Sequence, residues 1–236
     1  MPVSFNTNNA LDLFYHSGGE TIFPDSLRMV LNYAQDDDNI KNLKELAYLL
    51  ATAKNESDYS LQRWEADFLC GEKGIPYDPY PCQSALNYYA STDGKSNYYT
   101  KGVDKYNLPY FGRGLIQLTN KYNYEKWGKK IGVDLVDEGD LALVPINSYK
   151  IGSGFLKEKT FPYVNEGNLR QARISVNGGT KGLDDTNAEY DRWLWVLEQP
   201  NVNFKYSMWT KTNKIIVGVG LGATLLIGLY VLYKKN

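Results

Sequence analysis

LKELAYLLATAKNESDYSLQRWE, residues 43–65, is the stretch that most strongly predicts both the fold and the chemistry of this chain. Asn42 just before it, followed three residues later by Glu45, is typical of a capped helix start. Apolar residues then recur at three- and four-residue spacing, which predicts an amphipathic helix with one apolar face. The residues on that face are Leu43, Leu46, Ala47, Leu50 and Ala53.

Two glutamates of this stretch are candidates for acid–base chemistry. At about 100° per residue, Glu56 falls at the flank of the apolar face, where turn-forming residues end the predicted helix. Hydrocarbon around a carboxyl group disfavours its charged form, so this setting favours an acid that donates a proton. Glu65, in a more polar setting, supplies a second carboxylate, and such a pair suits cleavage of a glycosidic bond. A glutamate at a helix end is nevertheless more often an ordinary solvated surface residue.

The composition bounds the class of protein. The chain has 236 residues, 43% of them hydrophobic, which suits one core domain with a small addition. Its 26 basic and 27 acidic residues nearly cancel, so we predict no nucleic-acid partner. The one histidine, His16, argues against a histidine-based triad or a histidine-rich metal site. Cys70 and Cys82 fit either a short disulfide loop or two free thiols.

The rest of the first 203 residues is predicted to be mainly helical. The tyrosine-rich segment from Gly71 to Leu108 is predicted to be a long loop with room for one hairpin, which either walls a cleft or packs on its own domain. One helix is predicted to open at Asp25 or Ser26, and another to cover about residues 121–130 up to Gly132. A third is predicted to run from a cap at Asn168 to the turn at 177–179. The last is predicted to run from Asp184 or Asp185 to just before Pro200.

The sequence IIVGVGLGATLLIGLYVLY, residues 215–233, has no charged residue. A helix of this length rises about 28 Å, which is enough to cross a bilayer. We therefore predict a domain over residues 1–203, a linker over 204–214 and one transmembrane helix over 215–233. Gly218 and Gly222 form a small-xxx-small face that suits a homodimer. Lysines on both sides leave the orientation open, and the N-terminus has no predicted signal peptide.

Three blocks of sequence resemble a known family. They are AYLLATAKNESDYSLQ (47–62), YFGRGLIQLTNKYNY (110–124) and RISVNGGTKGLDD (173–185). In this order they resemble the acid-bearing helix, the Y-[YF]-G-R-G-x-I-Q-L-[ST]-x-x-x-N-Y signature and the R-x-x-x-N-G-G-x-x-G-x-x-D block of family 19 glycoside hydrolases. The likeness is greatest to the phage and bacterial members that act on peptidoglycan. The resemblance implies a lysozyme-like fold, mainly α within the α+β class, with two lobes around a cleft.

The resemblance also implies roles for single residues. Glu56 corresponds to the general acid, Glu65 to the general base that activates water, and Thr119 to the Ser or Thr that holds this water. Arg113 is expected to be structural and to tie the two lobes together, with a role in the cleft as the alternative. Positions that contact sugars or line the cleft in family members correspond to Gln117, Tyr122, Asn123 and Asn177. A carboxylate pair suffices for this chemistry, so no metal and no cofactor are implied.

Three positions depart from the family pattern. Asn55 stands directly before the acid, where the family usually has a histidine, and Ser57 directly after it stands for a threonine. Thr186 stands where relatives often have an arginine. An asparagine side chain forms hydrogen bonds but carries no charge, so the tuning of Glu56 is expected to differ. A weakened or altered enzyme is therefore one hypothesis.

The sequence leads us to predict a membrane-anchored glycosidase that cuts the glycan strand of peptidoglycan. Without a signal peptide and with a C-terminal span, it fits a phage lytic protein in the internal membrane of a virion or the inner membrane of the host. The first alternative is a chitinase, because the family includes enzymes that cleave chitin. The second is a wall-binding or membrane-structural protein that has lost activity. Lytic transglycosylation is also open, because related lysozyme-like folds perform it with one glutamate.

Overall fold

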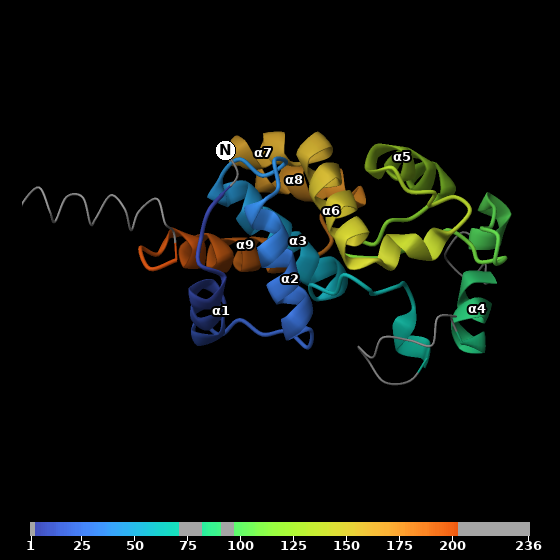
Figure 1. The fold of residues 1–236 in the computed structure, drawn as a ribbon, viewed down its shortest axis with the longest axis horizontal. Helices are drawn as coiled ribbons and strands as arrows, with labels where there is room; N and C mark the ends of the chain where they lie inside the picture. The colour runs from blue at the N-terminus through green and yellow to red at the C-terminus, as the bar shows by residue number, and fades with distance from the viewer. Residues whose placement is uncertain (1–2, 71–81, 91–96, 203–236) are drawn as a thin grey trace, which may run out of the picture.

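The computed structural model describes residues 3–70, 82–90 and 97–202, and within these ranges the protein is built from helices (Figure 1). The α-helices are α1 (Thr7–His16), α2 (Pro24–Gln35), α3 (Leu43–Ser57), α4 (Gln83–Ala90), α5 (Lys121–Ile131), α6 (Pro145–Lys159), α7 (Phe161–Asn165), α8 (Leu169–Asn177) and α9 (Leu183–Glu198). Short 3-10 helices are η1 (Asp67–Cys70), η2 (Tyr98–Lys101) and η3 (Gly139–Leu143).

The mainly helical class is confirmed, but the described ranges contain no strand ladder, so the β part of the predicted α+β class is wrong there. Among the described residues, backbone pairing between extended segments is confined to isolated bridges, such as the antiparallel bridge from Trp64 to Arg113. The bridge from Arg113 to Leu118 closes a turn whose glycine, Gly114, has φ +76°. Tight turns of this kind leave no room for a run of paired residues.

Helix α3 is the central helix of the structure. The predicted cap is confirmed, because Asn42 Oδ1 accepts a hydrogen bond from Glu45 N at 3.0 Å. Every residue from Glu45 to Ala53 is buried, so the helix is enclosed on all sides and does not have the single apolar face predicted from the sequence. Helices α9, α6 and α7 pack around it. The carboxylate of Glu45 remains satisfied because it accepts bonds from Lys41 N at 2.6 Å and Asn165 Nδ2 at 2.8 Å.

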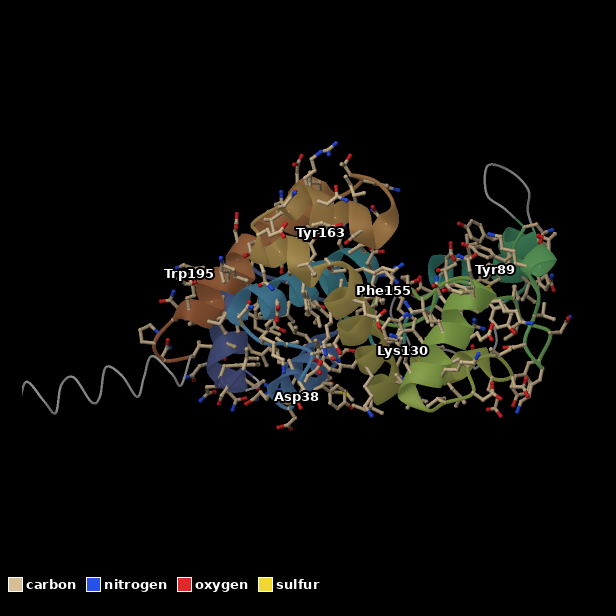
Figure 2. All side chains as sticks on the ribbon, turned by 90° about the horizontal axis from the view of Figure 1, so that it is seen from above. Asp38, Tyr89, Lys130, Phe155, Tyr163 and Trp195 are labelled. Atoms are coloured by element: carbon tan, nitrogen blue, oxygen red, sulfur yellow. A yellow bond between two sulfur atoms is a disulfide. The ribbon has the colours of Figure 1, made fainter. Side chains whose placement is uncertain are left out.

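The hydrophobic core is divided in a way that agrees with the predicted two lobes. The larger lobe, with the most extensive core, is formed by α1, α2, α3, α7, α8, α9 and one face of α6. The smaller lobe holds two further cores, one around Trp127 of α5 and one around Tyr89 of α4. Phe155 of α6 packs against both the larger core and the Trp127 core, and Figure 2 shows it between Trp195 and Tyr89. Helix α6 therefore joins the lobes.

Four predicted helices are confirmed. The helix predicted to open at Asp25 or Ser26 is α2, and the one predicted over 121–130 is α5. The helix predicted to follow Asn168 is α8, and the one predicted to start at Asp184 or Asp185 is α9. Helices α1, α6 and α7 were not predicted from the sequence. Helix α6 is hard to predict because it contains Gly152 and Gly154, which are weak helix formers. The structure explains Gly154, because a Cβ there would lie 2.6 Å from the ring of Trp127.

The prediction of a long loop from Gly71 to Leu108 is wrong over Gln83–Ala90, which forms α4. Ala85 and Tyr89 are one helical turn apart, and both are buried in the same core. Cys70 and Cys82 form a disulfide, which decides between the two alternatives that the sequence left open and anchors the start of α4 to η1.

The predicted linker 204–214 and transmembrane helix 215–233, with Gly218 and Gly222, lie outside the described residues. Among the helices that the structure does describe, none has both the length and the apolar character needed to cross a membrane.

Candidate active site

Glu56 lies in the last turn of α3 and is bonded to an arginine. Arg173 Nη1, from α8, lies 2.7 Å from Glu56 Oε1, and the two side chains are 5% and 21% exposed. The second oxygen, Oε2, accepts no hydrogen bond from any described residue. Glu56 is thus partly buried as predicted, but its partner is a guanidinium and not hydrocarbon. The periodicity of α3 cannot reveal this partner, because Arg173 lies 117 residues further along the chain.

Arg173 is held in place by the turn that follows its helix. Its Nε donates to the carbonyl oxygen of Lys181 at 2.8 Å, and Asn177 Nδ2 donates to the same oxygen at 3.1 Å. Asn177 Oδ1 accepts a bond from Gly179 N at 3.0 Å. The exposed Asn177, predicted to line the cleft, therefore shapes the turn that positions Arg173. Sequence reasoning gave Arg173 no role, although it opens the R-x-x-x-N-G-G block.

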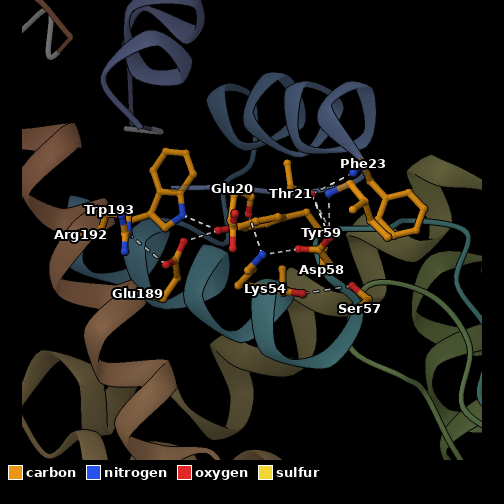
Figure 3. Close-up of polar contacts among 12 residues, drawn as sticks. Glu20, Thr21, Phe23, Lys54, Ser57, Asp58, Tyr59, Glu189, Arg192 and Trp193 are labelled. Carbon is orange, nitrogen blue, oxygen red and sulfur yellow. Dashed lines mark hydrogen bonds and ion pairs between the residues drawn. The ribbon is translucent and has the colours of Figure 1, made fainter. Parts of the chain in front are cut away.

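The backbone turns sharply just after Glu56, and Asp58 anchors this turn (Figure 3). Asp58 has φ +53°, in the left-handed region, which costs a non-glycine residue about 1–3 kcal/mol. Its Oδ1 pairs with Lys54 Nζ at 2.5 Å, and its Oδ2 accepts a bond from Ile22 N at 2.9 Å. These contacts offset the backbone strain and fix the end of α3.

Tyr59 is the second left-handed residue of the turn, with φ +67°. Its buried hydroxyl donates to Glu189 Oε1 and accepts a bond from Trp193 Nε1 at 2.9 Å, as Figure 3 shows. Burial and the adjacent Glu189 carboxylate raise the pKa of Tyr59 well above its usual value. The phenol therefore stays protonated and ties the turn after Glu56 to α9.

Glu65 is held through its backbone and its carboxylate. Glu65 N donates to Gly112 O at 2.7 Å, and Gly112 N donates to Glu65 Oε2 at 3.1 Å. Tyr98 OH donates to Glu65 Oε1 at 3.2 Å, and Tyr89 OH donates to the Glu65 carbonyl oxygen. A Cβ at position 112 would lie 2.8 Å from Gln117 Oε1 and 3.4 Å from Glu65 Cβ. Only glycine lets the two segments approach this closely.

Gln117 and Thr119 belong to the turn packed against Glu65. Gln117 has φ +54°, and its Nε2 donates to Gly114 O at 3.0 Å and to Arg63 O at 3.2 Å. Both amide hydrogens of Gln117, a predicted sugar contact, are thus used to hold the turn. Thr119 Oγ1 donates to Gln117 O at 2.8 Å, and the Thr119 oxygen keeps its lone pairs for an incoming donor.

Two other predicted contact residues lie in the first turn of α5. Tyr122 is 72% exposed, so its ring is accessible for stacking. Asn123 Nδ2 donates to Thr119 O at 2.8 Å, which connects α5 to the turn of Gln117.

A hydroxyl bridges the surroundings of the two glutamates. Ser57, directly after Glu56, donates through Oγ to Leu115 O at 2.9 Å. Leu115 lies in the same turn as Gln117. The structure therefore brings the first and second sequence blocks together, while Arg173 brings in the third.

Arg113 is structural, as predicted, but its contacts lie within one lobe. The side chain is fully buried and bonds to Asp140 Oδ1 at 2.6 Å and to Tyr124 OH at 2.9 Å. Its guanidinium carbon lies 3.6 Å from the centroid of the Phe111 ring. These partners all belong to the smaller lobe, so the expectation that Arg113 ties the lobes together is wrong; α6 joins them.

Two of the three positions that depart from the family pattern, Asn55 and Thr186, contact each other. Asn55 Nδ2 donates to Thr186 Oγ1 at 3.1 Å, and Thr186 Oγ1 donates to Gly182 O at 2.7 Å.

In the described ranges, no group of three or more His, Cys, Asp or Glu side chains is arranged to hold a metal ion.

The fold matches that of a solved enzyme. Chitinase C from Streptomyces griseus HUT6037 superimposes with a TM-score of 0.51 and 17% identity, over 84% of this chain and 94% of that one. The chain has the fold of this chitinase. At such an identity the likeness shows the fold alone.

Residues 80–159 also match the glycoside hydrolase family 19 model, described as chitinase class I. The predicted resemblance to family 19 is thus confirmed for that range.

Several plant chitinases have similar sequences. An endochitinase from Arabidopsis thaliana is 30% identical over 116 residues, 47% of this chain and 39% of that protein. The acidic endochitinase from Dioscorea japonica is 36% identical over 103 residues, 40% of this chain and 41% of that protein. The chain thus spans about two fifths of the length of these relatives.

Proposed function

We propose that this chain is a glycoside hydrolase of the chitinase class I type, which cleaves a polymer of N-acetylated amino sugars with Glu56 as general acid and Glu65 as general base. The observation that carries the proposal is the way the two carboxylates are held. Arg173 holds Glu56, whereas Gly112 N and Tyr98 hold Glu65. Two carboxylates with different partners can take different roles in acid–base catalysis.

The chemistry follows from these partners. Glu56 protonates the leaving glycosidic oxygen, and its Oε2, which accepts no bond from a described residue, is the atom suited to deliver the proton. Glu65 removes a proton from a water molecule, and the resulting nucleophile attacks the anomeric carbon from the opposite face of the sugar. Inversion of configuration results, which requires carboxyl groups about 6.5–9.5 Å apart. The lone pairs of Thr119 Oγ1 are available to orient that water.

The substrate class follows from the relatives and from one exposed ring. The similar plant proteins are named endochitinases, which favours chitin over the peptidoglycan predicted from the sequence. Tyr122 offers an accessible aromatic face, and aromatic faces stack well on the apolar faces of sugar rings.

A product assay with the full chain tests this proposal. The protein is incubated separately with chitin oligomers and with purified peptidoglycan, and the fragments are analysed by mass spectrometry. We expect fragments of the chitin oligomers with ordinary reducing ends, and their loss in Glu65→Gln. Fragments from peptidoglycan alone would favour a cell-wall hydrolase, and anhydro ends would indicate transglycosylation. Binding without fragments from either polymer would contradict a hydrolase.

The membrane anchor, the dimer and the phage origin predicted from the sequence remain separate proposals. The uncharged run at 215–233 supports the anchor. If it is correct, alkaline carbonate leaves the full chain in the membrane fraction, whereas release into the supernatant contradicts it.

A further inference from the structure

Two tyrosines outside the three sequence blocks bond to Glu65. Tyr98, in η2, donates to the Glu65 carboxylate at 3.2 Å, and Tyr89, in α4, donates to the carbonyl oxygen of the same residue. Both lie in the segment that the sequence predicted to be a loop.

The rings of these tyrosines are held by stacking. Tyr89 is stacked on Phe111, with centroids 4.3 Å apart and planes 1° apart, and Phe111 directly precedes the Gly112 that bonds to Glu65. Tyr98 meets Tyr89 edge-on, with centroids 6.0 Å apart. The Tyr98 hydroxyl is therefore presented to Glu65 by a rigid set of rings, which in turn packs on the backbone that supports the carboxylate.

Tyr98 is suited to donate a hydrogen bond and not to transfer a proton. Burial and the negative charge of Glu65 raise the pKa of Tyr98 above its usual value, so the phenol keeps its proton. A phenol that donates to a charged carboxylate forms a charge-assisted hydrogen bond, and at 3.2 Å this one is longer than the strongest of its kind. It fixes the position of Glu65 Oε1.

We propose that Tyr98 is a positioning residue for Glu65, whose hydroxyl holds the carboxylate of the general base in the orientation that activates water. This inference rests on the proposed function, because it requires Glu65 to act as the base. In this role Tyr98 acts through Glu65.

The matched control is Tyr99, the next residue of the same 3-10 helix. Tyr99 is also partly buried, and burial raises its pKa, but its hydroxyl does not bond to Glu65. Replacing either tyrosine with phenylalanine removes one hydroxyl and leaves the ring. A difference between the two variants therefore reports on the bond to Glu65.

The test measures kcat, KM and the thermal unfolding midpoint of the full chain with chitin oligomers. We expect Tyr98→Phe to lower kcat about tenfold with KM and the unfolding midpoint unchanged, as for a bond that acts on the chemical step. Tyr99→Phe should match the wild type. In a Glu65→Gln background, Tyr98→Phe should cause no further loss, because the carboxylate that it positions is absent.

Three results overturn the inference while leaving the proposed function intact: a wild-type kcat in Tyr98→Phe, equal losses in both phenylalanine variants, or a loss of kcat that follows a lower unfolding midpoint. No hydrolysis by the wild-type chain is a different outcome. It removes the proposed function and this inference together.

Discussion

Arg173 Nη1 and Glu56 Oε1, 2.7 Å apart, join α8 to the last turn of α3. Because the arginine is almost fully buried, removing it leaves a carboxylate without its charged partner. We expect Arg173→Ala to lower the free energy of unfolding by about 3 kcal/mol, the cost typical of breaking such a pair, and also to lower kcat. Urea denaturation and steady-state kinetics measure the two effects. Arg170→Ala, at an exposed position of α8, is the control and should change neither.

The hydrogen bond from Asn55 to Thr186 predicts an effect on stability. In Thr186→Val the shape of the side chain is kept, but Asn55 loses an acceptor and Gly182 O loses a donor. We expect the free energy of unfolding to fall by about 1–3 kcal/mol. Thr180→Val, at an exposed position of the preceding turn, should change it by less than about 0.5 kcal/mol. Equal effects of the two changes in urea denaturation would contradict the structural role of Thr186.

The Cys70–Cys82 disulfide predicts sensitivity to reductant. It joins residues 12 positions apart in the sequence, and by restricting the entropy of the unfolded chain such a bond stabilises the folded state by about 2–4 kcal/mol. Dithiothreitol should therefore lower the unfolding midpoint. It should also lower kcat, because α4 carries Tyr89, which bonds to the Glu65 backbone. A Cys70→Ser, Cys82→Ser double variant should start from the lower values and not respond to dithiothreitol. A wild-type midpoint that dithiothreitol leaves unchanged would argue against a stabilising disulfide.

The buried phenols predict how stability depends on pH. Burial raises the pKa of Tyr48 to about 12 and that of Tyr124 to about 12, from a usual value of 10.0. Above pH 10 the unfolded chain loses these protons while the folded chain keeps them, so the stability that is present below pH 10 falls as the pH rises toward 12. Each such phenol contributes a slope of about 1.4 kcal/mol per pH unit.

Tyr48→Phe isolates one of these phenols. Its buried hydroxyl has no hydrogen-bond partner among the described residues, so its removal should leave stability at neutral pH unchanged or slightly higher. Between pH 10 and 12 the free energy of unfolding should fall less steeply than in the wild type. Identical slopes for the two proteins would show that the Tyr48 phenol does not resist ionisation in the folded state.

Local signals in the sequence predicted much of the fold. The caps at Asn42 and Asn168 and the helix ends at Gly132 and at the 177–179 turn depend on neighbouring residues alone, and the structure has them where predicted. Helix α6 escaped prediction because its glycines weaken the local helix signal, and their reason lies in distant partners such as Trp127.

The candidate site was also predicted only in part, because some of its contacts join residues that are far apart in the sequence. The positions of Glu56 and Glu65 follow from one stretch of 23 residues, and the blocks around Gln117 and Asn177 follow from the resemblance. The contact between Arg173 and Glu56 does not, since it joins residues 117 positions apart. The same holds for Tyr98, whose bond to Glu65 requires knowledge of how η2 folds back on the turn at Gly112.

The measurement that tests the account most directly is the rate of chitin-oligomer hydrolysis by Glu56→Gln, which keeps the shape of the side chain but removes the acid. Glu166→Gln, an exposed glutamate on the larger lobe, is the control. The account predicts that Glu56→Gln loses a factor of about 10²–10⁴ in kcat while remaining folded, and that Glu166→Gln matches the wild type. Hydrolysis by Glu56→Gln at the wild-type rate would contradict the acid–base pair on which the proposed function rests.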